Sequence, residues 1–193
     1  MTAPTIGVFC SSATDVDETY HELARATGAA IGARGWTLLY GGTPTGTMGT
    51  LAEAVRDAGA PVVGVPLASF VDLGIHDTQA DELVIAQTLG QRKDIMLERC
   101  DAFIALPGGF GTLDELVEVI SQRQLRMHAN PLMLVDHRGF YAPLLAFFEL
   151  LRSERLAYGN TLGAYEAVDT VEVAITTLVH HFADRLEVDA QSS

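Results

Sequence analysis

Short, uninterrupted apolar runs alternate with longer helix-forming segments along most of this chain. The apolar runs are 5–10, 36–40, 62–65, 102–106 and 131–135. Continuous apolar strands are typical of a parallel sheet that is buried on both faces, and the helices between parallel strands supply that cover. The pattern therefore predicts an α/β fold, a Rossmann-like doubly wound parallel sheet with helices on both faces, in a single domain.

Helical periodicity fills most of the intervals between these runs. We expect helices over about 17–34, 48–58, 88–99, 112–127, 139–152 and 170–186. A short strand is predicted within 81–86, whereas 67–81 has no clear period and is predicted to be a loop. Because no repeat or linker divides the chain, the domain is expected to span 1–187, followed by a disordered tail at 188–193.

Composition restricts the compartment and the class of partner. No apolar run approaches the ~20 residues that cross a bilayer, and the start at Met1 lacks the basic region of a signal peptide. We therefore expect a cytoplasmic protein with no membrane partner. Cys10 and Cys100 are the only cysteines, which favours reduced thiols, and no Cys or His motif predicts a metal site.

The formal net charge of −13 disfavours a nucleic-acid partner, since such surfaces are normally basic. A site for a small anion must then gather positive charge locally. Five of the twelve Lys and Arg residues fall between positions 92 and 126. They are Arg92, Lys93, Arg99, Arg123 and Arg126. These residues either line such a site or belong to solvated helix faces. Because Arg92 and Lys93 are adjacent, we expect one of them to point to the site and the other elsewhere.

Two glycine-rich turns, 41–49 and 107–112, each follow a predicted strand and open a predicted helix. Ligands of doubly wound sheets bind beyond the carboxyl ends of the strands. Glycine lets the backbone approach a ligand, and the free N–H groups of a helix start attract an anion such as phosphate. Neither turn matches a P-loop or the strict dinucleotide fingerprint. The alternative interpretation is that the glycines serve only tight turns.

Glu115 also has two interpretations. The sequence from Thr112 to Glu115 has the Ser/Thr-x-x-Glu form of a capping box, in which the carboxylate only satisfies the helix end. Alternatively, Glu115 begins a polar stripe that forms the wall of a site. The stripe is Glu115, Glu118, Gln122 and Arg126, and the opposite side is expected to carry Leu113, Val117, Ile120 and Gln124.

Taken together, these motifs resemble those of the LOG (LONELY GUY) family. The family signature Pro-Gly-Gly-x-Gly-Thr-x-x-Glu is present at 107–115, and its upstream Arg-Lys pair is Arg92-Lys93, followed by Met96. The resemblance extends over about 5–155. The best-known members are cytokinin riboside 5′-monophosphate phosphoribohydrolases, although many carry the name lysine decarboxylase through an old misassignment.

The resemblance implies a substrate, a reaction and a set of site residues. The substrate is a nucleoside 5′-monophosphate, either an N6-modified adenylate, as in cytokinin activation, or AMP, and its N-glycosidic bond is hydrolysed to free base and ribose 5-phosphate. Arg92 and Glu115 match the catalytic pair of the family. The implied substrate-binding residues are Gly108, Gly109, Gly111, Thr112, Lys93, Met96, Ser12 and Gly42.

The same resemblance implies a homodimer with sites near the interface, and no cofactor. Lysine decarboxylation is not expected, because nothing in the sequence resembles a lysine that binds pyridoxal phosphate. The alternative is a carrier of the same fold, such as the similar molybdenum-cofactor carriers, which would hold a nucleotide or the molybdenum cofactor without turnover. The pair Arg92 and Glu115 favours the enzyme.

The chain departs from the family pattern in the first glycine turn and in the loop after the first strand. Thr43 stands for the third glycine, Thr47 stands for a leucine, and Ser11 follows Cys10 where the family has glycine. The pair Ser121-Gln122 also differs. We expect the changed positions to surround the base or the dimer interface, which leaves a different purine or pyrimidine nucleotide open as the substrate.

Overall fold

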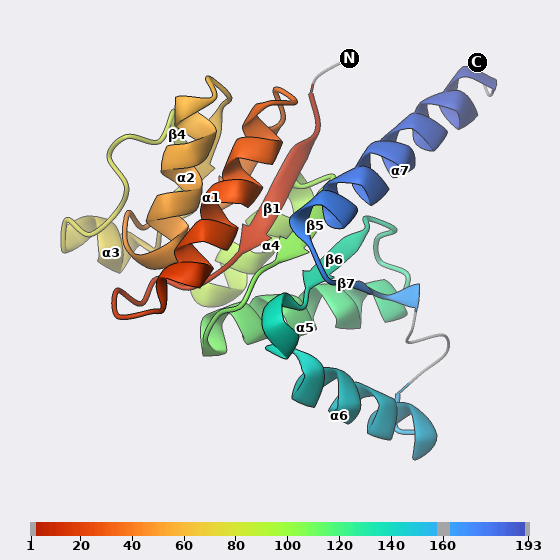
Figure 1. The fold of residues 1–193 in the computed structure, drawn as a ribbon. Helices are drawn as coiled ribbons and strands as arrows, with labels where there is room; N and C mark the ends of the chain where they lie inside the picture. The colour runs from red at the N-terminus through yellow and green to blue at the C-terminus, as the bar shows by residue number, and fades with distance from the viewer. Residues whose placement is uncertain (1–2, 158–162, 192–193) are drawn as a thin grey trace.

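The structure, a computed structural model, describes residues 3–157 and 163–191. Among these residues, seven strands form one parallel sheet in the order β4-β3-β2-β1-β5-β6-β7 (Figure 1). The strands are β1 (Thr5–Phe9), β2 (Thr37–Tyr40), β3 (Val62–Gly64), β4 (Glu82–Leu83), β5 (Ala102–Ala105), β6 (Leu132–Val135) and β7 (Glu166–Val168). The predicted α/β class and parallel sheet are confirmed.

Helices cover both faces of this sheet. They are α1 (Glu18–Gly32), α2 (Gly46–Asp57), α3 (Ala68–Asp72), α4 (Leu89–Arg99), α5 (Phe110–Gln124), α6 (Ala142–Ser153) and α7 (Val171–Gln191), with a 3₁₀ turn at His137–Gly139. Helices α1, α2 and α7 pack on one face, and α4, α5 and α6 pack on the other (Figure 1). The sheet is therefore doubly wound.

Alternate residues of each central strand supply the two cores. In β1, Ile6 and Val8 face the core under α1 and α2, whereas Phe9 faces the core under α4 and α5 and stacks on Phe103 at 5.7 Å between ring centroids. All four side chains are buried. Burying an apolar side chain of this size contributes about 1.5–3 kcal/mol, so the continuous apolar runs stabilise both layers at once.

Several elements differ from the sequence-based expectation. Helix α2 begins two residues before the expected start at 48, and α6 begins three residues after the expected start at 139. The predicted loop at 67–81 contains the short helix α3, and β7 was not predicted, because a three-residue edge strand is held by pairing with β6 and has no pattern of its own. Helix α5 begins at Phe110, two residues before the expected start. Helix α7 runs to Gln191, 192–193 lie outside the described residues, and the expected disorder of the tail stays a prediction. The domain boundary at 187 stays a prediction.

The topology fixes where a ligand can bind. Strands β1 and β5 are neighbours, but the chain leaves β1 toward β2 on one side and leaves β5 toward β6 on the other. The segments after these two strands diverge and open a crevice at the carboxyl edge, which is the usual ligand position of such sheets. Along the described ranges, no helix is long and apolar enough to cross a membrane.

Candidate active site

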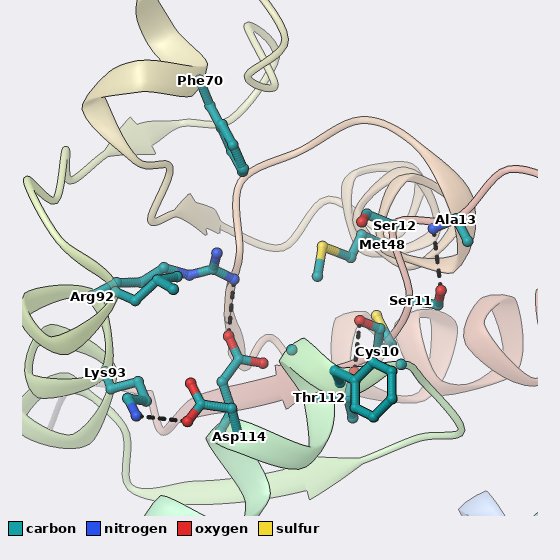
Figure 2. Close-up of a pocket in the computed structure, with 15 residues that line it drawn as sticks. Cys10, Ser11, Ser12, Ala13, Met48, Phe70, Arg92, Lys93, Thr112 and Asp114 are labelled. Atoms are coloured by element: carbon teal, nitrogen blue, oxygen red, sulfur yellow. Dashed lines mark hydrogen bonds and ion pairs between the residues drawn. The ribbon is translucent and has the colours of Figure 1, made fainter.

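A cleft of about 680 Å³ opens in this crevice, where the segments after β1 and β5 diverge. Its walls come from residues 10–13 after β1, from Met48 of α2, from Phe70 of α3, and from the starts of α4 and α5. Figure 2 shows Arg92 and Lys93 reaching in from one side, and Ser12 and Met48 lining the other. Elements distant in the sequence thus converge on the edge that the strand order predicts.

An ion pair between α4 and α5 lies in this cleft. The Arg92 Nη2 donates to the Glu115 Oε1 at 2.9 Å, and the two residues are only 8% and 6% exposed. The capping-box interpretation is wrong: the helix begins after Gly109, and the Thr112 hydroxyl donates instead to the Cys10 carbonyl oxygen at 3.0 Å. The predicted catalytic pair is therefore brought together inside the fold.

Burial sets the protonation of Glu115. Loss of water raises the pKa of the Glu115 carboxyl from 4.5 to about 7, against the opposing effect of the Arg92 charge. Asp114 raises this pKa further, whereas Lys93 lowers it. A carboxyl with a pKa near neutrality is suited to accept a proton from water and to return one, because general acid–base catalysis is most effective near the working pH.

The raised pKa predicts a pH-dependent stability. Between pH 4.5 and about 7 the folded chain keeps the Glu115 proton that the unfolded chain has released, so the free energy of unfolding falls as the pH rises. The shift amounts to about 3 kcal/mol. We expect the Glu115→Gln variant to lack this component of the decrease. Urea unfolding of both proteins at pH 4, 6 and 8 measures it, and parallel pH profiles would contradict it.

Lys93 lines the cleft together with Arg92, so the expectation that one of the pair points elsewhere is wrong. The Lys93 Nζ donates to Asp114 at 2.9 Å and to Glu118 at 3.3 Å. These bonds raise the pKa of Lys93, with the Asp114 bond as the largest cause. Adjacent side chains on a helix point in different directions. Helix α5 nevertheless lies close enough to α4 for Arg92 to pair with Glu115 and for Lys93 to pair with Asp114.

The start of α5 is an open anion cradle. Among the described residues, no side chain caps this helix, and the first three N–H groups of a helix have no acceptor within it. A Cβ built on Gly109 or Gly111 would meet nothing of the described chain within 4 Å. Neither glycine has a positive φ. Since neither packing nor backbone conformation requires glycine at these positions, the space suits a ligand that approaches the amides closely.

The remaining predicted site residues divide into two groups. Ser12, Gly109, Gly111 and Thr112 line the cleft. The other three, Gly108, Met96 and Gly42, lie outside the cleft lining.

Each of the three outside the lining packs against a neighbouring part of the fold. A Cβ on Gly108 would overlap the Thr112 side chain. Met96 is 1% exposed in the core beneath α4 and α5. Gly42 has a φ of +76° and lies against Pro66. These residues pack behind the cleft and do not line it. A sequence motif does not distinguish a residue that supports a site from one that contacts the ligand.

Two of the departures from the family pattern, both in the first glycine turn, do not line the cleft, and the expectation that the changed positions surround the base or the dimer interface stays a prediction. Thr43 and Thr47 are buried, and neither lines the cleft. The Thr47 hydroxyl accepts from the Ser11 N–H and donates to the Ser11 carbonyl oxygen, both at 3.0 Å. The Thr43 hydroxyl lies 3.2 Å from the Met48 sulfur. These threonines therefore stabilise the turn from within.

On α5, the predicted division into two faces holds only in part. Glu118 accepts from the Gln122 Nε2 at 2.8 Å, as neighbours in one stripe should. Val117, however, is 44% exposed, and Leu116 and Val119 take the buried face instead. Sequence reasoning also missed Met48 and Phe70 as wall residues. Phe70 lies on α3, in the segment that had no periodicity to interpret.

Comparison with known proteins places this geometry in a family. A family profile described as "possible lysine decarboxylase" matches residues 48–178. A Mycobacterium marinum protein named cytokinin riboside 5′-monophosphate phosphoribohydrolase is 39% identical over 89% of this chain and 91% of its own length. A relative of that name from Arabidopsis thaliana is 40% identical over 75% of this chain and 68% of its own length. This chain belongs to the LOG family.

Solved structures extend the similarity of this LOG-family chain to other groups, but at the level of the fold. The molybdenum cofactor carrier protein from Chlamydomonas reinhardtii has a TM-score of 0.74 and 22% identity, covering 94% of this chain and 99% of that one. DNA processing protein A from Streptococcus pneumoniae has a TM-score of 0.56 and 10% identity, covering 88% and 60%. At such identities the likeness shows a common architecture only.

Proposed function

We propose that this chain is a nucleoside 5′-monophosphate phosphoribohydrolase, which hydrolyses the N-glycosidic bond to give free base and ribose 5-phosphate. The observation that carries the proposal is the buried Arg92–Glu115 pair beside the open start of α5. A carboxyl with a pKa of about 7 and an anion cradle share one cleft. The names of the LOG-family relatives support the same reaction.

In the proposed mechanism, the free amides of Phe110, Gly111 and Thr112 bind the 5′-phosphate and thereby fix the ribose. Glu115 accepts a proton from a water molecule as the water oxygen forms a bond to the anomeric carbon. The bond from that carbon to the base nitrogen breaks, and its electron pair leaves with the base. The base takes up a proton from solvent, and Glu115 releases the proton that it accepted from water, which restores the carboxylate. The Glu115 carboxylate also stabilises the positive charge that develops on the ribose.

Arg92 has a second role in this mechanism. Its Nε is buried and has no hydrogen-bond partner in the described part of the chain. A buried donor without a partner carries a free-energy cost. Arg92 holds Glu115 through Nη2 and places its positive charge beside the reacting centre. Lys93, engaged by two acids, flanks the pair and adds positive charge near the phosphate.

The base faces the apolar part of the cleft, formed by Met48, Phe70 and Leu89. We propose N6-modified adenylates, as in cytokinin activation, or AMP as substrates. Incubation of the purified protein with a panel of nucleoside monophosphates, followed by chromatography, tests this. Release of base together with ribose 5-phosphate supports the proposal. Tight binding without release would overturn it and favour a carrier.

We further propose a cytoplasmic homodimer with the cleft near the interface. Phe110 is 91% exposed at the mouth of the cleft, and Val117 continues the apolar surface two turns along α5. Large apolar side chains exposed in this way are typical of an interface. Light scattering at micromolar concentration should give twice the chain mass of 20.7 kDa. A monomer would contradict the prediction.

A further inference from the structure

A buried carboxylate outside the cleft has no role in the mechanism above. Asp77, in the segment between α3 and β4, is 2% exposed. Its Oδ2 accepts from the Tyr40 hydroxyl at 2.5 Å and from the Arg56 Nη1 at 2.8 Å. Its Oδ1 accepts from the Gln79 N–H at 2.9 Å. Both oxygens are thus fully engaged.

These bonds keep Asp77 charged. Burial acts to raise its pKa, but the hydrogen bonds from Tyr40, Gln79 and Arg56 outweigh burial and hold the pKa below its ordinary value. Arg56 retains 22% exposure of its side chain, so part of the pair remains solvated. A charged group is seldom buried without specific partners, and the geometry here suits a fixed connector between elements.

What Asp77 connects is the first glycine turn. Its backbone N–H donates to the Gly42 carbonyl oxygen at 2.8 Å, and its carboxylate holds Tyr40. Asp77 is therefore hydrogen-bonded to both neighbours of Gly41, which are Tyr40 and Gly42. A Cβ on Gly41 would overlap the Arg92 Nη2, so the guanidinium lies directly against this backbone. The Nη2 is the atom that donates to Glu115.

We propose that Asp77 is a positioning residue for Arg92: by fixing Tyr40 and Gly42, it holds the Gly41 backbone as the rigid wall that presents the guanidinium to Glu115. The segment between α3 and β4, which shows no sequence periodicity, thereby acquires a role in the site. For its effect on turnover, the inference depends on the proposed function. Its effect on the Arg92–Glu115 pair does not.

The first test is the Asp77→Asn variant. The amide keeps the size of the side chain but places an N–H₂ group against one of the donors that now surround the carboxylate. We expect kcat for the released base to fall about tenfold, because a small displacement of a catalytic group is costly. KM should stay within about twofold, because the phosphate cradle on α5 is not disturbed.

A second variant guards against simple loss of folding. Tyr40→Phe removes only the buried hydroxyl and leaves Asp77 paired with Arg56, so we expect a smaller loss of kcat, about threefold.

The control is Asp81→Asn. Asp81 lies on the same segment and its Oδ2 accepts from the Val62 N–H at 2.8 Å, but within the described part of the chain it makes no hydrogen bond to the glycine turn. Asp81→Asn should keep wild-type kcat.

The decisive readout is the pKa of Glu115, followed by carbon NMR of the labelled carboxyl groups. If Asp77 positions Arg92, both Asp77→Asn and Tyr40→Phe should raise this pKa, because the nearby positive charge is less well placed. Asp81→Asn should leave it unchanged. A folded Asp77→Asn protein with wild-type Glu115 pKa overturns the inference. If the wild type releases no base, the proposed function fails, while this titration still decides the role of Asp77.

Discussion

Replacing Glu115 with glutamine should lower the rate of base release by about 10²- to 10⁴-fold, the usual contribution of a positioned acid–base group. Glutamine has the same shape and can still accept from Arg92, so packing around the buried pair is preserved. It cannot take a proton from water, however, and carries no charge to stabilise the developing cation on the ribose. Turnover of the best nucleotide found in the substrate panel, measured by chromatography, gives the effect.

A matched control distinguishes the loss of a catalytic carboxylate from the loss of one negative charge on α5. Glu118 lies one turn further along α5 and pairs with Lys93, but it does not line the cleft. Glu118→Gln should retain turnover within a few-fold, and both variants should give wild-type circular dichroism. Wild-type turnover of Glu115→Gln would show that the buried ion pair serves stability alone.

The second large effect is expected from closing the anion cradle. Gly109 has a φ of −89° and a ψ of −158°, an extended conformation that valine adopts readily. A valine side chain would extend over the α5 amides, where a Cβ meets no described atom within 4 Å. Loss of two charge-assisted hydrogen bonds costs about 3 kcal/mol or more. We therefore expect kcat/KM for Gly109→Val to fall about 100-fold or more.

Gly90 supplies the control for this variant. It lies in the first turn of α4 and does not line the cleft, and among the described atoms a Cβ there would meet only the Thr88 hydroxyl, at 3.8 Å. Gly90→Val should keep wild-type kcat/KM, and both valine variants should melt within a few degrees of the wild type. Unchanged kinetics of Gly109→Val would place the phosphate elsewhere. Isothermal titration with ribose 5-phosphate measures the same loss without turnover.

The sequence alone predicted the layers and the location of the site. Continuous apolar strands that alternate with helices leave few arrangements other than a covered parallel sheet. The glycine-rich turns after two strands then had to lie at one edge, and the signature at 107–115 identified Glu115 within it. These conclusions depend on local pattern and on chain order, which the sequence carries directly.

Other features depended on which side chains meet across the fold. Spacing could not tell whether Glu115 was a helix cap or a buried partner of Arg92, because that depends on how α4 crosses α5. Spacing also could not predict that Met96 and Gly42 lie outside the cleft lining, or that Phe70 belongs to it.

Nor could spacing connect Asp77 to the turn that lies against Arg92. Contacts between residues far apart in sequence arise from packing and burial, and burial also sets the pKa of Glu115. The sequence therefore determined the chemical groups and the edge of the sheet where they gather. Only the tertiary structure decided which of them touch, and hence which can act together.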